Sequence, residues 1–95
     1  MKTAKVKNCE VSECAYNLDS KCHALAITVG GDALHPKCDT FCKSSVKGGN
    51  LKKSASVGAC KVTECIFNGS LECQASQITV GYGQNEIDCL TFRLE

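Results

Sequence analysis

The sequence predicts a small β-rich fold with little helix, held together by cysteine chemistry more than by a large hydrophobic core. Three observations support this fold class. The chain repeats itself after 51 residues, it contains 9 cysteines and no Trp in 95 residues, and no segment shows a sustained 3.6-residue hydrophobic period. A single domain of this length buries only about 60 to 65% of its unfolded surface, which excludes a large enzyme core.

An internal repeat divides the chain into two units of similar sequence. Without a gap, residues 4–44 and 55–95 are identical at 16 of 41 positions, and four cysteines recur with the spacing C-x4-C-x7-C-x15-C. We interpret these segments as the first and second cysteine-rich repeat units of a tandem duplication. Residues 45–54 are rich in Lys, Ser and Gly and are predicted to form a flexible linker between the units.

Each unit is predicted to contain a β-hairpin after its second cysteine. In the second unit, Asn68 and Gly69 form the strongest short hairpin signal, because both turn positions tolerate positive φ. Centring the turn on this pair places Glu64 opposite Cys73 and brings Cys65 diagonally close to Cys73. The first unit has Asn-Leu-Asp-Ser at the same place, which predicts a looser turn.

A short strand is predicted after the third cysteine of each unit. The β-branched runs at residues 27–29 and 78–80 favour extended backbone, and the glycines Gly30 and Gly81 are expected to end these strands. The sequences CEVSEC and CKVTEC are too short to classify. The prediction is therefore two small β-rich units with irregular loops.

A disulfide or a metal ion is expected to cross-link each unit, because each unit has few large apolar side chains for a core. A zinc ion held by four thiolates contributes about 10 to 16 kcal/mol, and a disulfide about 2 to 4 kcal/mol. Since no apolar stretch typical of a signal peptide follows the basic N-terminus, we expect reduced thiols and favour metal. The predicted ligands are Cys9, Cys14, Cys22 and Cys38 for one zinc ion, and Cys60, Cys65, Cys73 and Cys89 for the other.

The cysteine spacing leaves alternatives open. The tightest pair is C-x4-C, at the wide end of the range for zinc ligands, so disulfides or free thiols stay possible. Zinc is favoured over iron because neither unit has the paired C-x-x-C loops of rubredoxin-like iron sites. His23 and His35 have no histidine counterparts in the second unit, so both are interpreted as solvated polar residues outside the shared site.

The pattern Val-x2-Cys-x-Val-x2-Cys-x-[Tyr/Phe]-Asn, followed by Cys-x-Ala-x2-Ile-x-Val and Cys-x-Thr-Phe, occurs in both units. It resembles the small cysteine-rich domain of unknown function 1540, and the two copies cover nearly the whole chain. This family occurs largely in Firmicutes, including spore formers. The resemblance therefore implies a cytoplasmic or spore-associated bacterial protein, and it brings no enzymatic activity. Cys42 departs from the four-cysteine unit, so its role is not inherited.

These features predict a non-enzymatic tandem metal-binding module that serves as a small binding or structural protein, with a protein partner or a second copy as its target. The alternative is a disulfide-stabilised protein of the spore-coat type, cross-linked through Cys42. No apolar run approaches the length of a membrane span. The linker lysines have no interleaved aromatic residues or Arg, which argues against nucleic-acid binding, and no pattern indicates a small-molecule substrate.

Overall fold

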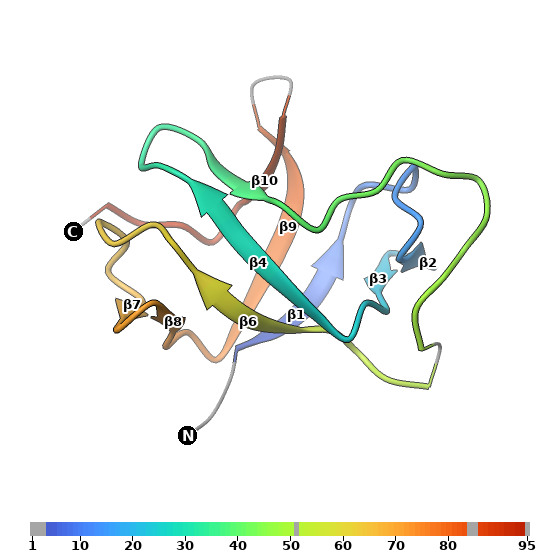
Figure 1. Cartoon of the computed structure of the whole chain (residues 1–95), viewed down its shortest axis with the longest axis horizontal. Coiled ribbons are helices and arrows are strands. Elements are labelled where there is room, and N and C mark those ends of the chain that lie inside the picture. The colour runs from blue at the N-terminus through green and yellow to red at the C-terminus, as the bar shows by residue number, and fades with distance from the viewer. Residues whose placement is uncertain (1–3, 51, 84–85, 95) are drawn as a thin grey trace.

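The computed structural model describes residues 4–50, 52–83 and 86–94. Leu51 of the linker and Glu95 at the end of the second repeat unit lie outside the described residues. The described part of the chain contains strands, turns and loops and has no helix (Figure 1). The predicted β-rich fold class is confirmed.

The two repeats contribute equivalent sets of strands. In the first repeat these are β1 (Lys5–Cys9), β2 (Asn17–Leu18), β3 (Lys21–Cys22), β4 (Ala26–Gly31) and β5 (Pro36–Cys38). In the second they are β6 (Ser56–Cys60), β7 (Asn68–Gly69), β8 (Glu72–Cys73), β9 (Gln77–Gly83) and β10 (Glu86–Cys89). The strands predicted at residues 27–29 and 78–80 are β4 and β9, and both continue through the glycines expected to end them.

Six of these strands close into one barrel in the order β1-β6-β4-β5-β10-β9, while the hairpins β2-β3 and β7-β8 lie on opposite sides of it (Figure 1). The parallel pairs join different repeats. β1 pairs with β9, with Val6 opposite Ile78, and β6 pairs with β4, with Val57 opposite Ile27. The first strand of each repeat therefore completes the sheet of the other repeat.

The barrel has an approximate two-fold axis that relates the repeats. Lys5 pairs with Ser56 where β1 meets β6, and Lys37 pairs with Asp88 where β5 meets β10. Each pair consists of positions 51 residues apart, so each is a contact between equivalent residues. Such a self-complementary contact is what a two-fold axis produces in a symmetric dimer.

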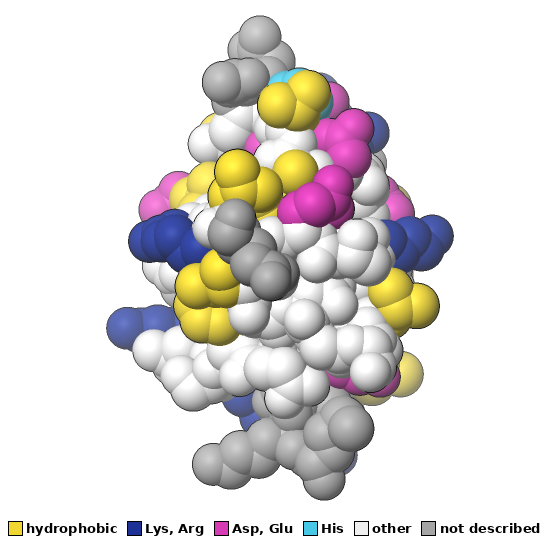
Figure 2. Space-filling model, turned by 90° about the vertical axis from the view of Figure 1, so that its left-hand side faces the viewer, with side chains coloured by type: hydrophobic (Ala, Val, Ile, Leu, Met, Phe, Trp, Pro, Cys, Tyr) yellow, Lys and Arg dark blue, Asp and Glu magenta, His cyan; other side chains and the backbone are white. Residues whose placement is uncertain are grey.

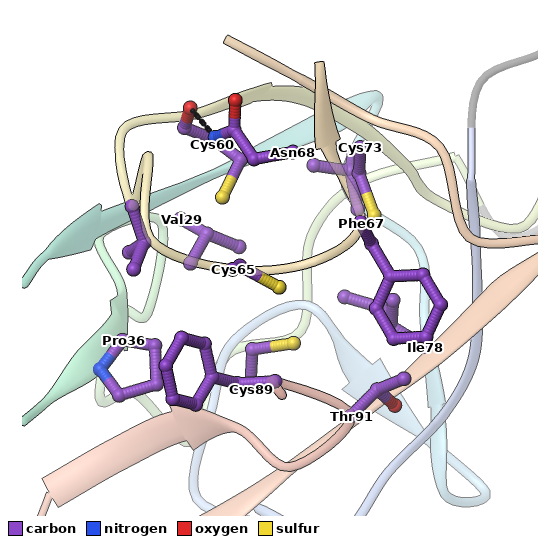
Figure 3. Close-up of a pocket in the computed structure, with 13 residues that line it drawn as sticks. Val29, Pro36, Cys60, Cys65, Phe67, Asn68, Cys73, Ile78, Cys89 and Thr91 are labelled. Carbon is purple, nitrogen blue, oxygen red and sulfur yellow. Dashed lines mark hydrogen bonds between the residues drawn. The ribbon is translucent and has the colours of Figure 1, made fainter. Parts of the chain in front are cut away.

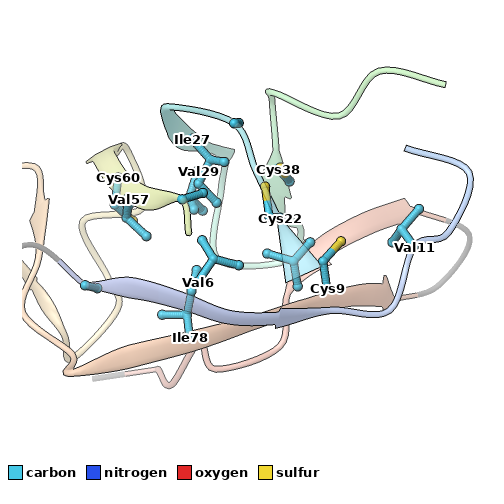
Figure 4. Close-up of a cluster of buried hydrophobic side chains, with 14 of the residues drawn as sticks. Val6, Cys9, Val11, Cys22, Ile27, Val29, Cys38, Val57, Cys60 and Ile78 are labelled. Carbon is cyan, nitrogen blue, oxygen red and sulfur yellow. The ribbon is translucent and has the colours of Figure 1, made fainter. Parts of the chain in front are cut away.

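The core lies inside this shared barrel and is built from both repeats (Figure 4). Buried and exposed side chains alternate along the first part of β4 and β9, as expected for strands with one face toward the core. The largest fully buried side chains are Val6, Val11, Ile27, Val57, Val62 and Ile78. Burial of these side chains depends on the strands contributed by the other repeat.

The predicted turn centre in the second hairpin is wrong by two residues. Positive φ angles occur at Ser70 (54°) and Leu71 (68°), and Asn68 pairs with Cys73 where Glu64 was expected. The reason is the Asn68 side chain, which donates to the Cys60 carbonyl at 2.8 Å and accepts from the Leu71 backbone N–H at 3.2 Å. These bonds hold Asn68 in the strand with Gly69, and Ser70 and Leu71 turn the chain.

The linker is bonded to the first repeat through residues near His23. The Asn50 N–H donates to the His23 carbonyl at 2.8 Å, and the His23 Nδ1 lies 2.8 Å from the Lys53 carbonyl. Gly49 has a φ of 90°, and a Cβ there would collide with the same His23 carbonyl. The interpretation of His23 as a solvated residue is wrong, because its side chain is buried under this segment.

Because the repeats share strands, we expect an isolated repeat comprising residues 1–50 to have no folded monomeric form. Under reducing conditions with zinc present, its folded fraction should rise with concentration as two copies exchange β1 strands. Analytical ultracentrifugation combined with far-UV circular dichroism checks this expectation. A concentration-independent folded monomer would contradict the shared-barrel fold.

Replacing Asn17 with Ala should destabilise the chain by about 1 to 3 kcal/mol. Asn17 Nδ2 donates to the Cys9 carbonyl at 2.7 Å in a buried environment, so the substitution leaves that carbonyl without its partner. Chemical denaturation measures the change in the free energy of unfolding. Asn50→Ala is the matched control; its exposed side chain accepts a local hydrogen bond from the Lys52 N–H, and its effect should stay within about 0.5 kcal/mol.

Candidate metal centres

Four of the five cysteines of the first repeat line one small cavity at the edge of the barrel core. Cys9 ends β1, Cys22 ends β3 and Cys38 ends β5, while Cys14 forms a single β-bridge with Lys43. Val80 and Ile87 from the second repeat complete the wall. We call these four thiols the first tetrad.

The second tetrad consists of Cys60, Cys65, Cys73 and Cys89, which line the equivalent cavity on the other side of the barrel (Figure 3). The sulfur atoms drawn in Figure 3 point into a common space, although they come from four separate segments. Val29 and Pro36 of the first repeat close this cavity. Each tetrad therefore depends on the other repeat for part of its enclosure.

The structure brings together all eight predicted ligands in the predicted sets of four, and all nine cysteines are free thiols. Cys42 is exposed and lines neither cavity. In the described residues, no three thiols have sulfur atoms that all lie within 4.8 Å of one another. Zinc bonds of ~2.3 Å place tetrahedral sulfur ligands ~3.8 Å apart, so coordination requires side-chain rotations that draw the sulfurs inward.

Burial dominates the protonation of these thiols. Burial first, and neighbouring cysteines of the same tetrad second, raise the pKa of Cys38 and of Cys89 from 9.0 to about 11. Burial and two neighbouring thiols also raise the pKa of Cys22 and of Cys73. Thiolates in these cavities therefore need a nearby positive charge to form at neutral pH.

Backbone amides are directed at the same sulfur atoms and have the opposite effect. In the first tetrad, the N–H of Ala24 is directed at Cys22, and those of Thr40 and Phe41 at Cys38, which lowers the pKa of both thiols. The second tetrad has the same arrangement at the positions 51 residues further on. Such hydrogen bonds favour a thiolate and orient it, as outer-shell contacts do for metal ligands.

Shared residues outside the tetrads hold the ligand-bearing loops in place. The Thr28 N–H donates to Thr40 Oγ1 at 3.1 Å, and the equivalent Thr79 N–H donates to Thr91 Oγ1 at 2.9 Å. These bonds tie the loop after the fourth cysteine to β4 or β9. The sequence prediction assigned no role to these threonines, although their identity in both repeats was a usable signal.

The sequence prediction also missed a group outside both tetrads. His35, interpreted as solvated, lies beside Glu86 and Asp88 where β5 meets β10. His35 and Glu86 occupy equivalent positions in the two repeats. The repeat alignment therefore treats them as two versions of one position and does not indicate that they lie side by side. No local sequence signal could have revealed this contact, because it crosses the two-fold axis.

The family model described as Domain of Unknown Function (DUF1540) matches residues 8–44 and 59–92. The two matches cover more than half of the chain and coincide with the two tetrad-bearing repeats. Comparisons with curated proteins and with solved structures give no match. The chain belongs to the DUF1540 family and carries two tandem copies of its domain.

Proposed function

We propose that this chain is a non-enzymatic metal-binding module in which each tetrad holds one structural zinc ion. The observation that carries the proposal is the gathering of four thiols around an enclosed cavity, with backbone amides directed at two of the sulfurs, in the same form in both repeats. Four thiolates are the ligand set of structural zinc sites. Soft sulfur ligands also suit iron, but zinc imposes no geometric preference and accommodates these irregular loops.

Zinc in these positions would stabilise the shared barrel as a whole. Each tetrad joins the ends of β1, β3 and β5, or of their equivalents, and each cavity is closed by residues of the other repeat. A structural zinc ion contributes about 10 to 16 kcal/mol of apparent folding free energy. Each filled site adds a net charge of 2−, so two sites move the formal charge from +1 to about −3.

A structural or binding role follows from the closed ligand sets. With four protein ligands, a zinc ion keeps no open position for a substrate or an activated water, so no catalytic role is proposed.

The face in Figure 2 mixes apolar, acidic and basic side chains. Among the described residues, no helix is long and apolar enough to span a membrane. We propose a protein partner or self-association, in the cytoplasm or in a spore.

Chain purified under reducing conditions should contain about two zinc ions, measured by inductively coupled plasma mass spectrometry together with native mass spectrometry. Cys22→Ser removes one ligand of the first tetrad and should reduce the content to about one. Cys42→Ser is the matched control, because Cys42 lies outside both cavities and its loss should leave two ions bound.

Metal content well below two, with an intact mass lower by two protons for each disulfide, would instead support the disulfide-stabilised alternative. Covalent dimers that disappear in Cys42→Ser on a non-reducing gel would support cross-linking through that thiol. A zinc content unchanged by Cys22→Ser would contradict the assignment of the first tetrad.

The pH dependence of stability should change sign when zinc binds. Without metal, the pKa of Cys38 and Cys89 is near 11, whereas unfolded thiols ionise near 8.5, so the free energy of unfolding should fall as pH rises from about 8.5 to 11. With zinc, the thiols must lose their protons, so stability should fall as pH decreases below about 7.

Denaturation curves with zinc and with a chelator, recorded across this pH range, measure both slopes. Calorimetry at pH 7 in buffers of different ionisation enthalpy should show release of about four protons per zinc ion. A slope of the same sign with zinc and with chelator would count against thiolate coordination.

A further inference from the structure

A cluster outside both tetrads lies on the two-fold axis of the barrel. His35, Glu86 and Asp88 each offer one ligand atom, and these three atoms lie within 4.8 Å of one another. His35 Nδ1 lies 3.0 Å from Glu86 Oε2. Asp88 comes from the same strand as Glu86, and His35 immediately precedes β5, which pairs with that strand. A histidine and two carboxylates from the two repeats therefore meet at one point.

Asp88 Oδ1 has no partner in the described part of the chain, and His35 Nδ1 and Glu86 Oε2 have only each other. His35 Nδ1, Glu86 Oε2 and Asp88 Oδ1 are all buried, and none makes a well-aligned hydrogen bond within the described part of the chain. The Asp88 residue is only 7% exposed. Buried polar atoms are normally paired, and each orphan costs about 1 to 3 kcal/mol. An unpartnered, buried Asp88 oxygen beside the His35–Glu86 pair indicates a missing group that all three side chains can contact.

The missing group must be positively charged. Two carboxylates face each other here, and among the described residues no lysine or arginine forms an ion pair with either of them. A proton on His35 could serve Glu86 alone, but it would leave Asp88 Oδ1 without a partner. A divalent cation is small enough to contact all three atoms and carries enough charge to balance both carboxylates.

We infer that His35, Glu86 and Asp88 form a third metal site, distinct from the thiol tetrads, which takes a divalent cation of the manganese-to-zinc series. One imidazole nitrogen and two carboxylate oxygens suit these ions. Bonds of ~2.1 Å place ligand atoms about 3.0 to 3.4 Å apart, a spacing that the His35–Glu86 pair already has, while the Asp88 oxygen lies within 4.8 Å of both. The remaining coordination positions belong to water or to a ligand from a partner, so this site is open where the tetrads are closed.

Manganese separates this site from the tetrads, since Mn²⁺ prefers carboxylate and imidazole to thiolate. The experiment titrates the full chain, kept reduced by a non-thiol reductant, with Mn²⁺ and follows the loss of the free-ion signal by electron paramagnetic resonance. The expected result is about one bound Mn²⁺ per chain. His35→Gln and Asp88→Asn should each weaken binding by at least about tenfold.

Asp39→Asn is the matched control, because Asp39 is an exposed carboxylate beside Cys38 that does not belong to the cluster. It should leave Mn²⁺ binding unchanged. If circular dichroism shows that Asp88→Asn does not fold, Glu86→Gln decides, since the Glu86 side chain is already 31% exposed. Absence of binding up to about 1 mM Mn²⁺, or binding that survives the cluster substitutions in folded protein, overturns the third site.

Discussion

Reciprocal parallel pairing between the two repeats is the constraint on which the rest of the structure depends. β1 lies beside β9 and β6 lies beside β4, so neither repeat forms a complete sheet by itself. The largest buried side chains, such as Ile27 and Ile78, are enclosed only when both repeats are in place. The same pairing positions the ends of β1 and β6, where each tetrad begins with Cys9 or Cys60. Core and thiol sites are therefore parts of one cooperative unit.

The barrel centre and the hairpins at its sides differ in how they can be stabilised. The centre of the barrel is packed with Val and Ile from both repeats, and the small hairpins at its sides bury little apolar surface. The tetrads lie where a hairpin meets the barrel, because the third cysteine ends β3 or β8 and the others come from the barrel strands or their loops. A metal ion at that junction would hold a hairpin that is too short to be stable alone.

Because two copies of the repeat are joined in one chain, the residues on the two sides of the two-fold axis can differ. In a dimer of identical repeats, residues on the axis face copies of themselves. Here His35 faces Glu86 and Lys37 faces Asp88, although each pair occupies equivalent positions. Unlike residues therefore meet across the axis here, as Lys5 and Ser56 do where β1 meets β6. The candidate third metal site exists only because the copies diverged there.

The sequence by itself determined the duplication, the two sets of four cysteines and the β-branched strands, because these depend on residue identity and spacing within one repeat. It misplaced the turn at Asn68, whose side chain bonds to the Cys60 carbonyl at the end of β6, outside the hairpin itself. Only the tertiary structure decided that β1 joins β9, that each tetrad is closed by the other repeat, and that His35 meets Glu86. Pairing between strands about 70 residues apart leaves no local pattern, since a parallel neighbour favours the same β-branched residues whichever repeat supplies it.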